Sequence, residues 1–474
     1  MNKHITINFV EVHNILDSCS KLQSGRRRIG KTFLIREYYS HKDCIFFQVT
    51  GVQGDTTKMQ LKKFANSISE VFLDNINIES PKTWGEAFEL LQKQIIKTNK
   101  KIVIFLDELP WLAVRKSRLL QEIDYFWNHH WSTTNKVILI ICGSSASWLI
   151  KKIIYNKGGL HNRITCQIRL LPFTLSETKN YLHNKKIKLN YAHILNLYMA
   201  LGGVPYYLNY VTAGLTAQEN IQKIIFDNNA PLRDEFTKLF HSLFDNTDAY
   251  IELIKIIAQK QEGIRRAEIT TMAKYSANGG TMSKRLNDLC TGGFLKEYVP
   301  WGRNNGEYYK LIDEFCLFYL TWVDIYKNKQ FASNYWLNQI QQPSYYAWSG
   351  YAFEAICTKH INNITNALKI NTASTISAWR FIPRKHLDSG VQIDLVIDRT
   401  DNAISLCEIK YTNTQFTIDK RYANILQKKI EIFLNVTKTK KQIFMNMVCA
   451  NGLKQNSYAK DLIAQYATLD DLFK

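Results

Sequence analysis

Eight residues near the start of the chain have the types and spacing of a phosphate-binding loop. Residues 25–32 (GRRRIGKT) match the pattern G-x-x-x-x-G-K-[ST] in full. Glycines let backbone N–H groups curl around phosphate oxygens, and the following helix presents its positive end to the same anion. Lys31 would reach the β- and γ-phosphates of ATP, and Thr32 would be a Mg²⁺ ligand. The predicted ATP site therefore comprises Gly25, Arg26, Arg27, Arg28, Ile29, Gly30, Lys31 and Thr32.

A strand that ends in two acids follows this loop. Residues 101–108 (KIVIFLDE) have the short apolar run of a buried strand. Asp107 would hold Mg²⁺ through water, and Glu108 would polarise the water that attacks the terminal phosphate. The alternative is an ordinary strand capped by surface acids, and the complete loop upstream favours the nucleotide site.

Two further residues are candidates for the same reaction. A second apolar run, residues 137–142, ends at Gly143 and Ser144, and the small polar side chain of Ser144 could sense the terminal phosphate. Arg163 could stabilise the charge of the transition state as an arginine finger. A packing role for Arg163 fits the sequence equally well, and both alternatives stay open.

A second set of charged residues lies towards the C-terminal end. Residues 391–398 and 404–410 are predicted strands, and a hairpin could bring Asp394 beside Glu408. Glu408 and Lys410 would share one face, because residues i and i+2 of a strand point the same way. Asp394 and Glu408 could bind Mg²⁺ while Lys410 positions water, as metal-assisted phosphodiester hydrolysis requires. An E-x-K triplet alone also occurs in many solvated strands.

The elements that must position these residues indicate several domains. Strands at residues 44–50, 101–106 and 137–142 alternate with amphipathic helices, which predicts a parallel α/β sheet. After a helical region, two helices, a Gly-Gly turn, a helix and two short strands follow, in the order of a winged helix. The predicted boundaries are 1–173 for the core, 174–247 for a helical lid, 248–312 for the winged helix, 313–344 for a helical connector and 345–474 for a C-terminal α/β domain.

The predicted winged helix carries cations where such domains contact DNA. Lys284 and Arg285 lie early in its recognition helix, and Arg303 lies in the wing turn beside Trp301. Recognition helices enter the major groove through their N-terminal residues, and cationic wings contact phosphates. The alternative is a helix-turn-helix that clamps onto protein, either within this chain or outside it.

One expected element is missing from the sequence pattern. A P-loop normally follows an apolar central strand, but residues 14–24 (NILDSCSKLQS) resemble a polar helix or loop. Residues 5–12 (ITINFVEV) are β-like but end too far upstream to enter the loop directly. We therefore expect a gap in the sheet, and with it weakened or lost nucleotide affinity.

Composition and charge limit the classes of partner. The chain has 474 residues, of which 46% are hydrophobic, and this indicates a folded protein rather than a disordered one. It carries 61 Lys and Arg residues against 41 Asp and Glu, and the net charge of +20 favours a polyanion such as nucleic acid. A lysine-rich proteome would give the same balance.

Two absences in the sequence complete these limits. No run reaches the roughly 18 apolar residues of a membrane-spanning helix, so we expect no membrane partner. The nine cysteines form no C-x-x-C pair, so zinc is not expected, and their odd number indicates reduced thiols in the cytoplasm.

Several stretches together resemble a known family. These stretches are similar to the archaeal-type P-loop ATPases of the AAA+ and STAND assemblage, and they include GRRRIGKTFLIREY at 25–38, LDELPWLA at 106–113, CGSSASWL at 142–149 and LGGVPYYL at 201–208. The resemblance extends to the winged helix and to a C-terminal domain of unknown function, and it covers nearly the whole chain. It implies Mg-ATP binding, with hydrolysis or an ATP-driven switch.

The C-terminal domain also resembles the PD-(D/E)XK nucleases. Asp394, Glu408 and Lys410 match the core of that motif, and Glu354 resembles the acid that those nucleases carry on a preceding helix. The resemblance implies a restriction-endonuclease-like α/β fold and four catalytic candidates.

Together these observations predict a cytoplasmic Mg²⁺-dependent ATPase that acts on DNA through a winged helix and a nuclease-like domain. One alternative is an ATP-dependent switch that binds protein partners or further copies of itself. Another is a degraded relative that no longer hydrolyses ATP because the strand before the P-loop is missing.

Overall fold

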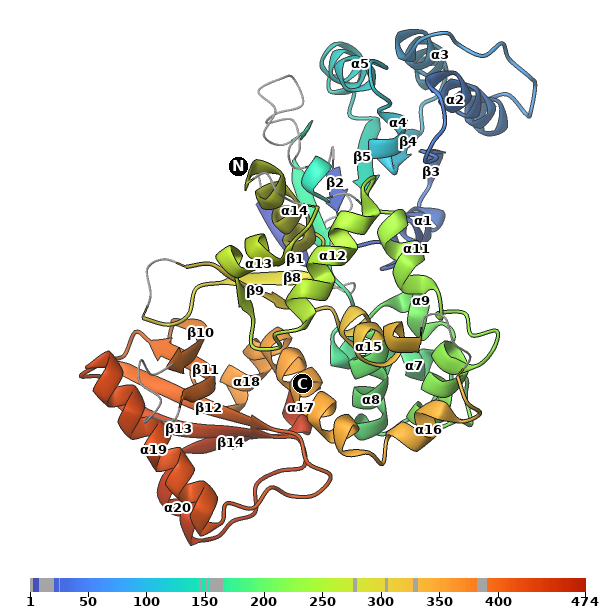
Figure 1. The fold of residues 1–474 in the computed structure, drawn as a ribbon. Helices are drawn as coiled ribbons and strands as arrows, with labels where there is room; N and C mark the ends of the chain where they lie inside the picture. The colour runs from blue at the N-terminus through green and yellow to red at the C-terminus, as the bar shows by residue number, and fades with distance from the viewer. Residues whose placement is uncertain are drawn as a thin grey trace. The chain divides into compact units, whose positions relative to one another are not determined.

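The computed structural model describes most of the chain as two compact units (Figure 1). Unit 1 contains residues 1–173, 204–206 and 287–293, and unit 2 contains residues 174–203, 207–286 and 294–474. The residues that the structure describes are 3–7, 21–24, 26–144, 146–149, 152–153, 165–275, 279–302, 306–326, 331–381 and 390–474.

Unit 1 is built on a six-stranded parallel sheet with the order β1-β6-β2-β5-β4-β3. Its strands are β1 (Lys3–Ile7), β2 (Lys21–Ser24), β3 (Cys44–Thr50), β4 (Lys101–Asp107), β5 (Val137–Gly143) and β6 (Cys166–Leu170). Every residue of β4 after Lys101 is buried, because a parallel sheet is covered on both faces and its central strands are apolar throughout. The three strands predicted at 44–50, 101–106 and 137–142 are thereby confirmed.

The gap expected in front of the P-loop is not there. Strand β2 ends at Ser24, directly before Gly25 in the sequence, and it pairs in parallel with β5 on one side and with β6 on the other. The prediction of a missing strand was therefore wrong, because β2 has four residues and Leu22 is its only large apolar one. So short and polar a segment shows no periodicity, and the strand becomes evident only through its pairing with neighbours. The β-like segment upstream is the edge strand β1, which pairs with β6.

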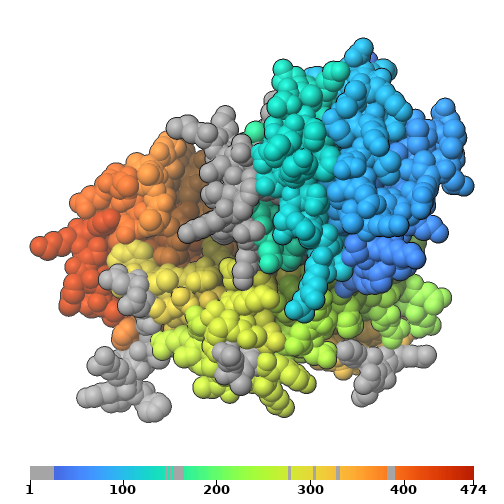
Figure 2. All heavy atoms as spheres, turned by 90° about the horizontal axis from the view of Figure 1, so that it is seen from above, coloured from blue at the N-terminus to red at the C-terminus, as the bar shows by residue number. Residues whose placement is uncertain are grey.

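Helices cover both faces of this sheet. Along β4, Ile102, Ile104 and Leu106 face one hydrophobic cluster, while Val103 and Phe105 face the other. The first cluster is completed by α2 (Thr57–Phe72), α3 (Trp84–Lys97) and α5 (Leu119–Phe126), and the second by α1 (Lys31–Ser40). Figure 2 shows α2, α3 and α5 as one continuous surface, coloured blue to cyan. The sheet is thus packed against helices on both of its faces.

Unit 2 begins with helices and continues into a winged-helix arrangement. The first helices are α7 (Leu175–Asn184), α8 (Tyr191–Leu201), α10 (Ala217–Ile221) and α11 (Glu235–His241). The winged-helix segment, residues 247–311, has α12 (Thr247–Ala258), β7 (Ile264–Arg265), α13 (Arg266–Met272), α14 (Gly279–Thr291), β8 (Leu295–Tyr298) and β9 (Tyr308–Leu311). Its strands form an antiparallel sheet with the order β7-β9-β8. The three helices and strands β8 and β9 follow the predicted order, whereas β7 was not predicted.

An aromatic cluster lies between the first helices of unit 2 and the C-terminal elements. Trp322 of α15 (Glu314–Trp322), Trp336 of α16 (Tyr335–Gln339) and Trp348 of α17 (Pro343–Lys359) pack edge to face, with ring centroids between 5.4 and 6.1 Å apart. Phe226 stacks on Trp336 with an interplanar angle of 5°. This segment was predicted as a helical connector, and it forms a buried core of its own.

The C-terminal elements form a five-stranded mixed sheet with the order β10-β11-β12-β13-β14. Its strands are β10 (Ser374–Phe381), β11 (Val391–Arg399), β12 (Ala403–Lys410), β13 (Gln442–Cys449) and β14 (Gln465–Ala467). Strand β11 pairs antiparallel with both β10 and β12, and the last three strands run in parallel. Helix α19 (Lys420–Thr437) packs its apolar side on one face, and α17 packs against β12.

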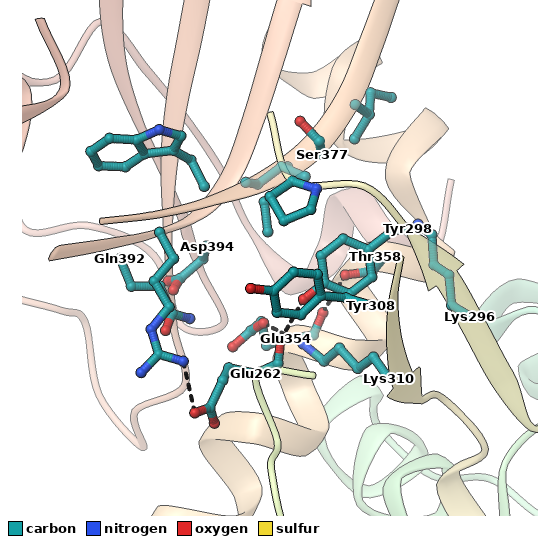
Figure 3. A pocket seen from close by; sticks show the side chains of 16 residues that line it. Glu262, Lys296, Tyr298, Tyr308, Lys310, Glu354, Thr358, Ser377, Gln392 and Asp394 are labelled. Atoms are coloured by element: carbon teal, nitrogen blue, oxygen red, sulfur yellow. Dashed lines mark hydrogen bonds and ion pairs between the residues drawn. The ribbon is translucent and has the colours of Figure 1, made fainter. Parts of the chain in front are cut away.

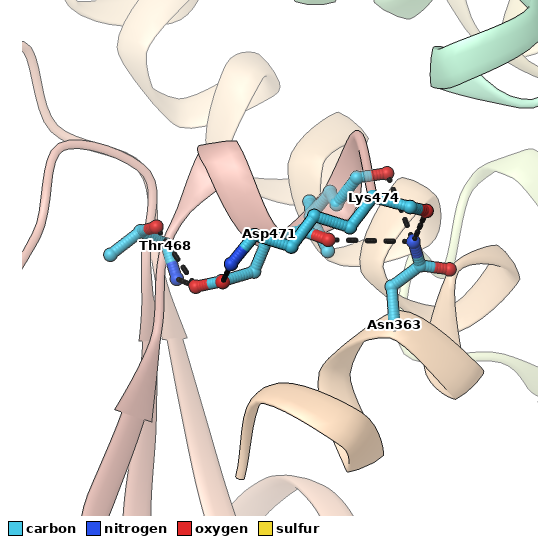
Figure 4. A network of polar contacts seen from close by, with 5 residues as sticks. Asn363, Thr468, Asp471 and Lys474 are labelled. Carbon is cyan, nitrogen blue, oxygen red and sulfur yellow. Dashed lines mark hydrogen bonds and ion pairs between the residues drawn. The ribbon is translucent and has the colours of Figure 1, made fainter.

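The last turn of the described chain is fastened to helix α18 (Ile361–Ala367). Thr468 and Asp471 form a capping box at the start of α21 (Leu469–Leu472), and Asn363 donates a hydrogen bond to the backbone oxygen of Lys474 over 2.7 Å (Figure 4). A capping box satisfies two backbone N–H groups that a helix start otherwise leaves unpaired, so this short helix is well anchored.

Candidate nucleotide site and C-terminal acidic cluster

The predicted phosphate-binding loop leads from β2 into helix α1. Gly30 caps the helix with φ at +85°, a left-handed conformation that glycine adopts without strain. Arg28 also has a positive φ of 72°, so the chain curls tightly before the helix begins. Gly25 lies outside the described residues. The described part of the loop thus has the backbone shape that its sequence predicts.

Lys31 and Thr32, the residues predicted to bind phosphate and metal, begin helix α1, and each side chain makes a hydrogen bond. The Lys31 side chain is buried, and its ammonium donates a hydrogen bond to the backbone oxygen of Arg26 over 2.8 Å. The Thr32 hydroxyl donates to Asp107 Oδ2 over 2.7 Å. Hydroxyl and carboxylate oxygens are the ligands that Mg²⁺ prefers in proteins. The side chains of Thr32 and Asp107 therefore fit a Mg²⁺ ion bound beside the loop.

Burial shapes the electrostatics of Asp107. Burial raises the pKa of its carboxyl group, and the hydrogen bond from Thr32 opposes this rise. The adjacent charge of Glu108 raises the pKa further, whereas the nearby Lys31 lowers it. A bound cation would favour the ionised form of Asp107 for the same reason as Lys31 does.

Glu108 is held in place by Ser144 at the end of the neighbouring strand. Both the backbone N–H and the hydroxyl of Ser144 donate to Glu108 Oε2, over 3.0 and 2.8 Å. Glu108 itself adopts a left-handed φ of 48°. A Cβ atom added to Gly51 would lie 2.6 Å from the Glu108 backbone oxygen, so the turn has no room to shift towards β3. The structure therefore brings together two residues that the sequence placed at separate strand ends.

Two aromatic rings beside the loop were not predicted. The guanidinium of Arg27 lies over the Trp111 ring at 5.2 Å, and that of Arg28 lies over the Tyr206 ring at 4.2 Å. Such stacking orients an arginine without removing its charge. In the sequence, the only indication of these contacts is the presence of aromatic residues in the stretches LPWL (109–112) and VPYY (204–207). Arg26 is also buried, while Arg163 lies outside the described residues.

The acidic cluster of the C-terminal domain comprises Glu354 of α17, Asp394 of β11 and Glu408 of β12, three of the predicted catalytic candidates. Strands β11 and β12 pair with Leu395 opposite Cys407, which places Asp394 opposite Glu408. Asp394 Oδ2 accepts a hydrogen bond from the backbone N–H of Ile409 over 3.0 Å. Lys410 Nζ lies 3.9 Å from Glu408 Oε2, as expected for neighbours on one strand face.

Lysines that the sequence analysis missed pair with two of these acids. Lys429 of α19 lies 2.6 Å from Glu408 Oε1, and Lys310 of β9 lies 2.6 Å from Glu354 Oε1. Burial and then the charge of Asp394 raise the pKa of Glu408 to about 7, although Lys429 opposes the rise. Glu354 and Glu408 are thus each paired with a lysine. In the part of the chain that the structure describes, no group of three or more His, Cys, Asp or Glu side chains is arranged to hold a metal ion.

Arg285 does not occupy the DNA-facing position suggested by the sequence. It is buried, and its guanidinium donates to the backbone oxygen of Tyr275 over 2.8 Å. Its neighbour Lys284 is exposed. Arg303 lies outside the described residues. On α14 the cation that remains available to a polyanion is therefore Lys284.

Comparison with known families identifies the region around the nucleotide site. Residues 24–211 match the model of an ATPase domain predominantly from Archaea. These residues are therefore similar to the ATPase domains of this family. The predicted resemblance is thereby confirmed for the ATPase domain, which includes the loop, the Asp107 strand and the 201–208 stretch. Residues 321–424 match a second family model, described as archaeal and bacterial proteins of unknown function.

Individual proteins are also similar to this chain. An uncharacterized protein of Methanocaldococcus jannaschii is 23% identical over 412 residues, which cover 85% of each chain. Among solved structures, a Walker-type ATPase of Pyrococcus abyssi is 18% identical and covers 66% of this chain and 94% of its own, with a TM-score of 0.47. A STAND protein of Pyrococcus horikoshii with a tetratricopeptide repeat sensor is 17% identical and covers 77% of this chain and 50% of its own, with a TM-score of 0.29.

None of the helices within the described ranges combines the length and the apolar character that a membrane-spanning helix needs.

Proposed function

We propose that the ATPase domain binds and hydrolyses Mg-ATP and that the nucleotide controls a module acting on nucleic acid. The observation that carries this proposal is the hydrogen bond between Thr32 and Asp107, because it joins the two side chains that would bind the metal ion. The continuous pairing of β2 with β5 and β6 supports it further, since the loop has the strand that anchors it. The alternative of a degraded relative without that strand loses its basis.

Each residue of the site has a role that follows from its contacts. Lys31 and the backbone N–H groups of the loop would bind the phosphates, and Thr32 and Asp107 would hold Mg²⁺. When bound, the Mg²⁺ ion neutralises charge on the phosphate oxygens. Glu108, held by Ser144 at the strand end, would orient the attacking water and accept its proton.

Equilibrium binding of a fluorescent ATP analogue with Mg²⁺ tests this proposal. We expect the Lys31→Ala variant to bind at least about 100-fold more weakly than the unmodified protein, because it loses a buried charge–phosphate contact. Lys58→Ala is the matched control, since Lys58 is an exposed lysine of the same unit. Equal binding by the Lys31→Ala variant, or no binding by the unmodified protein, would contradict the proposal.

The nucleic-acid part of the proposal is supported by the net charge of +20 and by the exposed Lys284 of α14. An alternative target is protein, either a partner or another copy of this chain. The burial of Arg285 favours this alternative, because it removes one of the cations predicted to contact DNA.

A second candidate function is cleavage of phosphodiester bonds by a nuclease-like C-terminal domain. It is supported by Asp394 lying opposite Glu408, with Lys410 beside them. Nicking of supercoiled DNA in the presence of Mg²⁺ tests it, with Asp394→Ala as the variant. Equal activity in both proteins would assign the cleavage to a contaminant and overturn this candidate.

A further inference from the structure

The winged-helix segment is fastened to the C-terminal elements by two ion pairs and by the side chain and backbone of Trp301. Lys310 of β9 forms its ion pair with Glu354 of α17 at 2.6 Å, and both side chains are largely buried. A second ion pair joins Arg380 of β10 to Glu262 at 2.8 Å, and both of these side chains are half-exposed. Figure 3 marks both ion pairs.

Trp301 forms the third fastening, at the base of the wing. Its backbone N–H donates to the Ala378 oxygen of β10 over 3.1 Å, and its indole N–H donates to Asp398 Oδ2 over 3.0 Å. Its ring lies 5.1 Å from that of Phe433, against the core of the C-terminal sheet. A wing residue that is docked in this way is not available for phosphate contact in the same conformation.

These fastenings surround a small cavity. The cavity has a volume of about 80 Å³ and is partly open to solvent. Tyr298, Tyr308 and Lys310 line it from the winged-helix segment, and Glu354, Gln392 and Asp394 line it from the C-terminal elements (Figure 3). Protein interiors are close-packed, so a contact made largely of polar links around a cavity has less packing to lose when it opens.

The size of this cavity determines what can reach Asp394. Pockets that accommodate small molecules are larger, at roughly 300–1,000 Å³, and a DNA duplex has a major groove alone about 12 Å wide. A polynucleotide cannot approach Asp394 through the cavity while the winged-helix segment covers it.

We propose that the winged-helix segment is an autoinhibitory latch that covers the acidic cluster of the C-terminal domain. The closed latch is held by Lys310, Trp301 and Arg380, and it admits a polynucleotide to Asp394 only after these contacts open. The inference deepens the second candidate function and rests on it for the nature of the substrate.

Labelling of an introduced cysteine tests the cover directly. The Asp394→Cys substitution is made alone and together with Trp301→Ala and Arg380→Met, and the modification of residue 394 by a bulky maleimide is followed by peptide mass spectrometry. We expect the labelling rate to rise about tenfold or more in the latch variant, which corresponds to a loss of about 1.4 kcal/mol from the closed state. Lys474→Met is the matched control, because it breaks an ion pair with Asp471 away from the latch.

A second measurement gives a result even if the Trp301→Ala variant misfolds, because it does not use that variant. Hydrogen exchange of residues 295–302 and 374–381 in the otherwise unmodified protein should speed up with rising salt, because salt screens the ion pairs that hold the latch. Labelling and exchange that stay unchanged would overturn the latch. Faster labelling without Mg²⁺-dependent nicking, in variants that retain Asp394, would instead leave the latch standing and overturn the nuclease-like function.

Discussion

The hydroxyl of Thr32 donates a hydrogen bond to Asp107 Oδ2 over 2.7 Å, although 75 positions separate the two residues in the chain. We predict that Thr32→Val removes the Mg²⁺ dependence of nucleotide binding, whereas Thr32→Ser retains it, because serine keeps the oxygen and valine keeps only the shape. Titration of a fluorescent ATP analogue at several Mg²⁺ concentrations checks this. The same Mg²⁺ response in all three proteins would show that the hydroxyl is not a ligand.

Substitutions at Glu108 and Ser144 should distinguish the binding of the nucleotide from its hydrolysis. Glu108→Gln should lower the hydrolysis rate by about 10²–10⁴-fold, the range for a general base, while leaving nucleotide affinity intact. Ser144→Ala should have a smaller effect, since the backbone N–H of residue 144 still donates to Glu108. Single-turnover hydrolysis and equilibrium binding, measured side by side, distinguish these outcomes. A matching loss of affinity in Glu108→Gln would mean that Glu108 contributes to binding instead.

Adjacent residues of α14 should behave in opposite ways. Lys284→Ala is expected to weaken DNA binding and to reduce the salt slope by about 1, because one phosphate contact is lost, without a change in stability. Arg285→Gln should instead lower the free energy of unfolding by about 1–3 kcal/mol, because Arg285 is buried and bonded to the Tyr275 oxygen. Urea denaturation and salt-dependent binding assays measure the two effects. If neither substitution altered DNA affinity, we would conclude that helix α14 contacts protein and not DNA.

A buried histidine makes unit 2 sensitive to acid. The pKa of His360 is lowered by burial, against the opposing charge of Glu314, and its Nε2 accepts a hydrogen bond from the Leu175 N–H over 3.0 Å. The unfolded chain therefore binds more protons than the folded one below the usual histidine pKa of about 6.5. This stability is present above that pH and is lost as the pH falls towards the folded pKa.

We therefore expect the free energy of unfolding to drop between pH 7.5 and pH 5 by about 1.4 kcal/mol for each unit by which the His360 pKa is lowered. His360→Gln should flatten this dependence, whereas His41→Gln should not, because His41 lies on the surface. Urea denaturation at a series of pH values measures the effect. Parallel curves for the unmodified protein and His360→Gln would show that another group titrates.

Much of the fold is readable from the sequence because its strongest signals are local. Strands β4 and β5 are continuous apolar runs, and the loop pattern at residues 25–32 fixes the start of α1. The same reasoning failed at β2, whose four residues carry no pattern and whose strand state depends on pairing with β5 and β6. Deletion of a strand and shortening of a strand look alike in a sequence, but only shortening leaves the sheet intact.

The candidate sites were predictable to the extent that their residues are close in sequence or match a motif. Glu408 and Lys410 share a strand, so their proximity follows from the spacing. Lys310 and Lys429 reach the acidic cluster from β9 and α19, and no spacing connects them with it. Arg285 was misjudged because helical position alone does not tell which side faces the core.

The aromatic cluster of the connector gives the protein a spectroscopic signature. Indole transitions couple when rings lie within a few ångströms of each other in fixed, asymmetric orientations. Trp322, Trp336 and Trp348 have this arrangement, with each pair inclined at 77–85°. Near-ultraviolet circular dichroism should therefore report the order of this core in the unlabelled protein, and a loss of that signal would mark loosening between the helical region and the C-terminal sheet before secondary structure is lost.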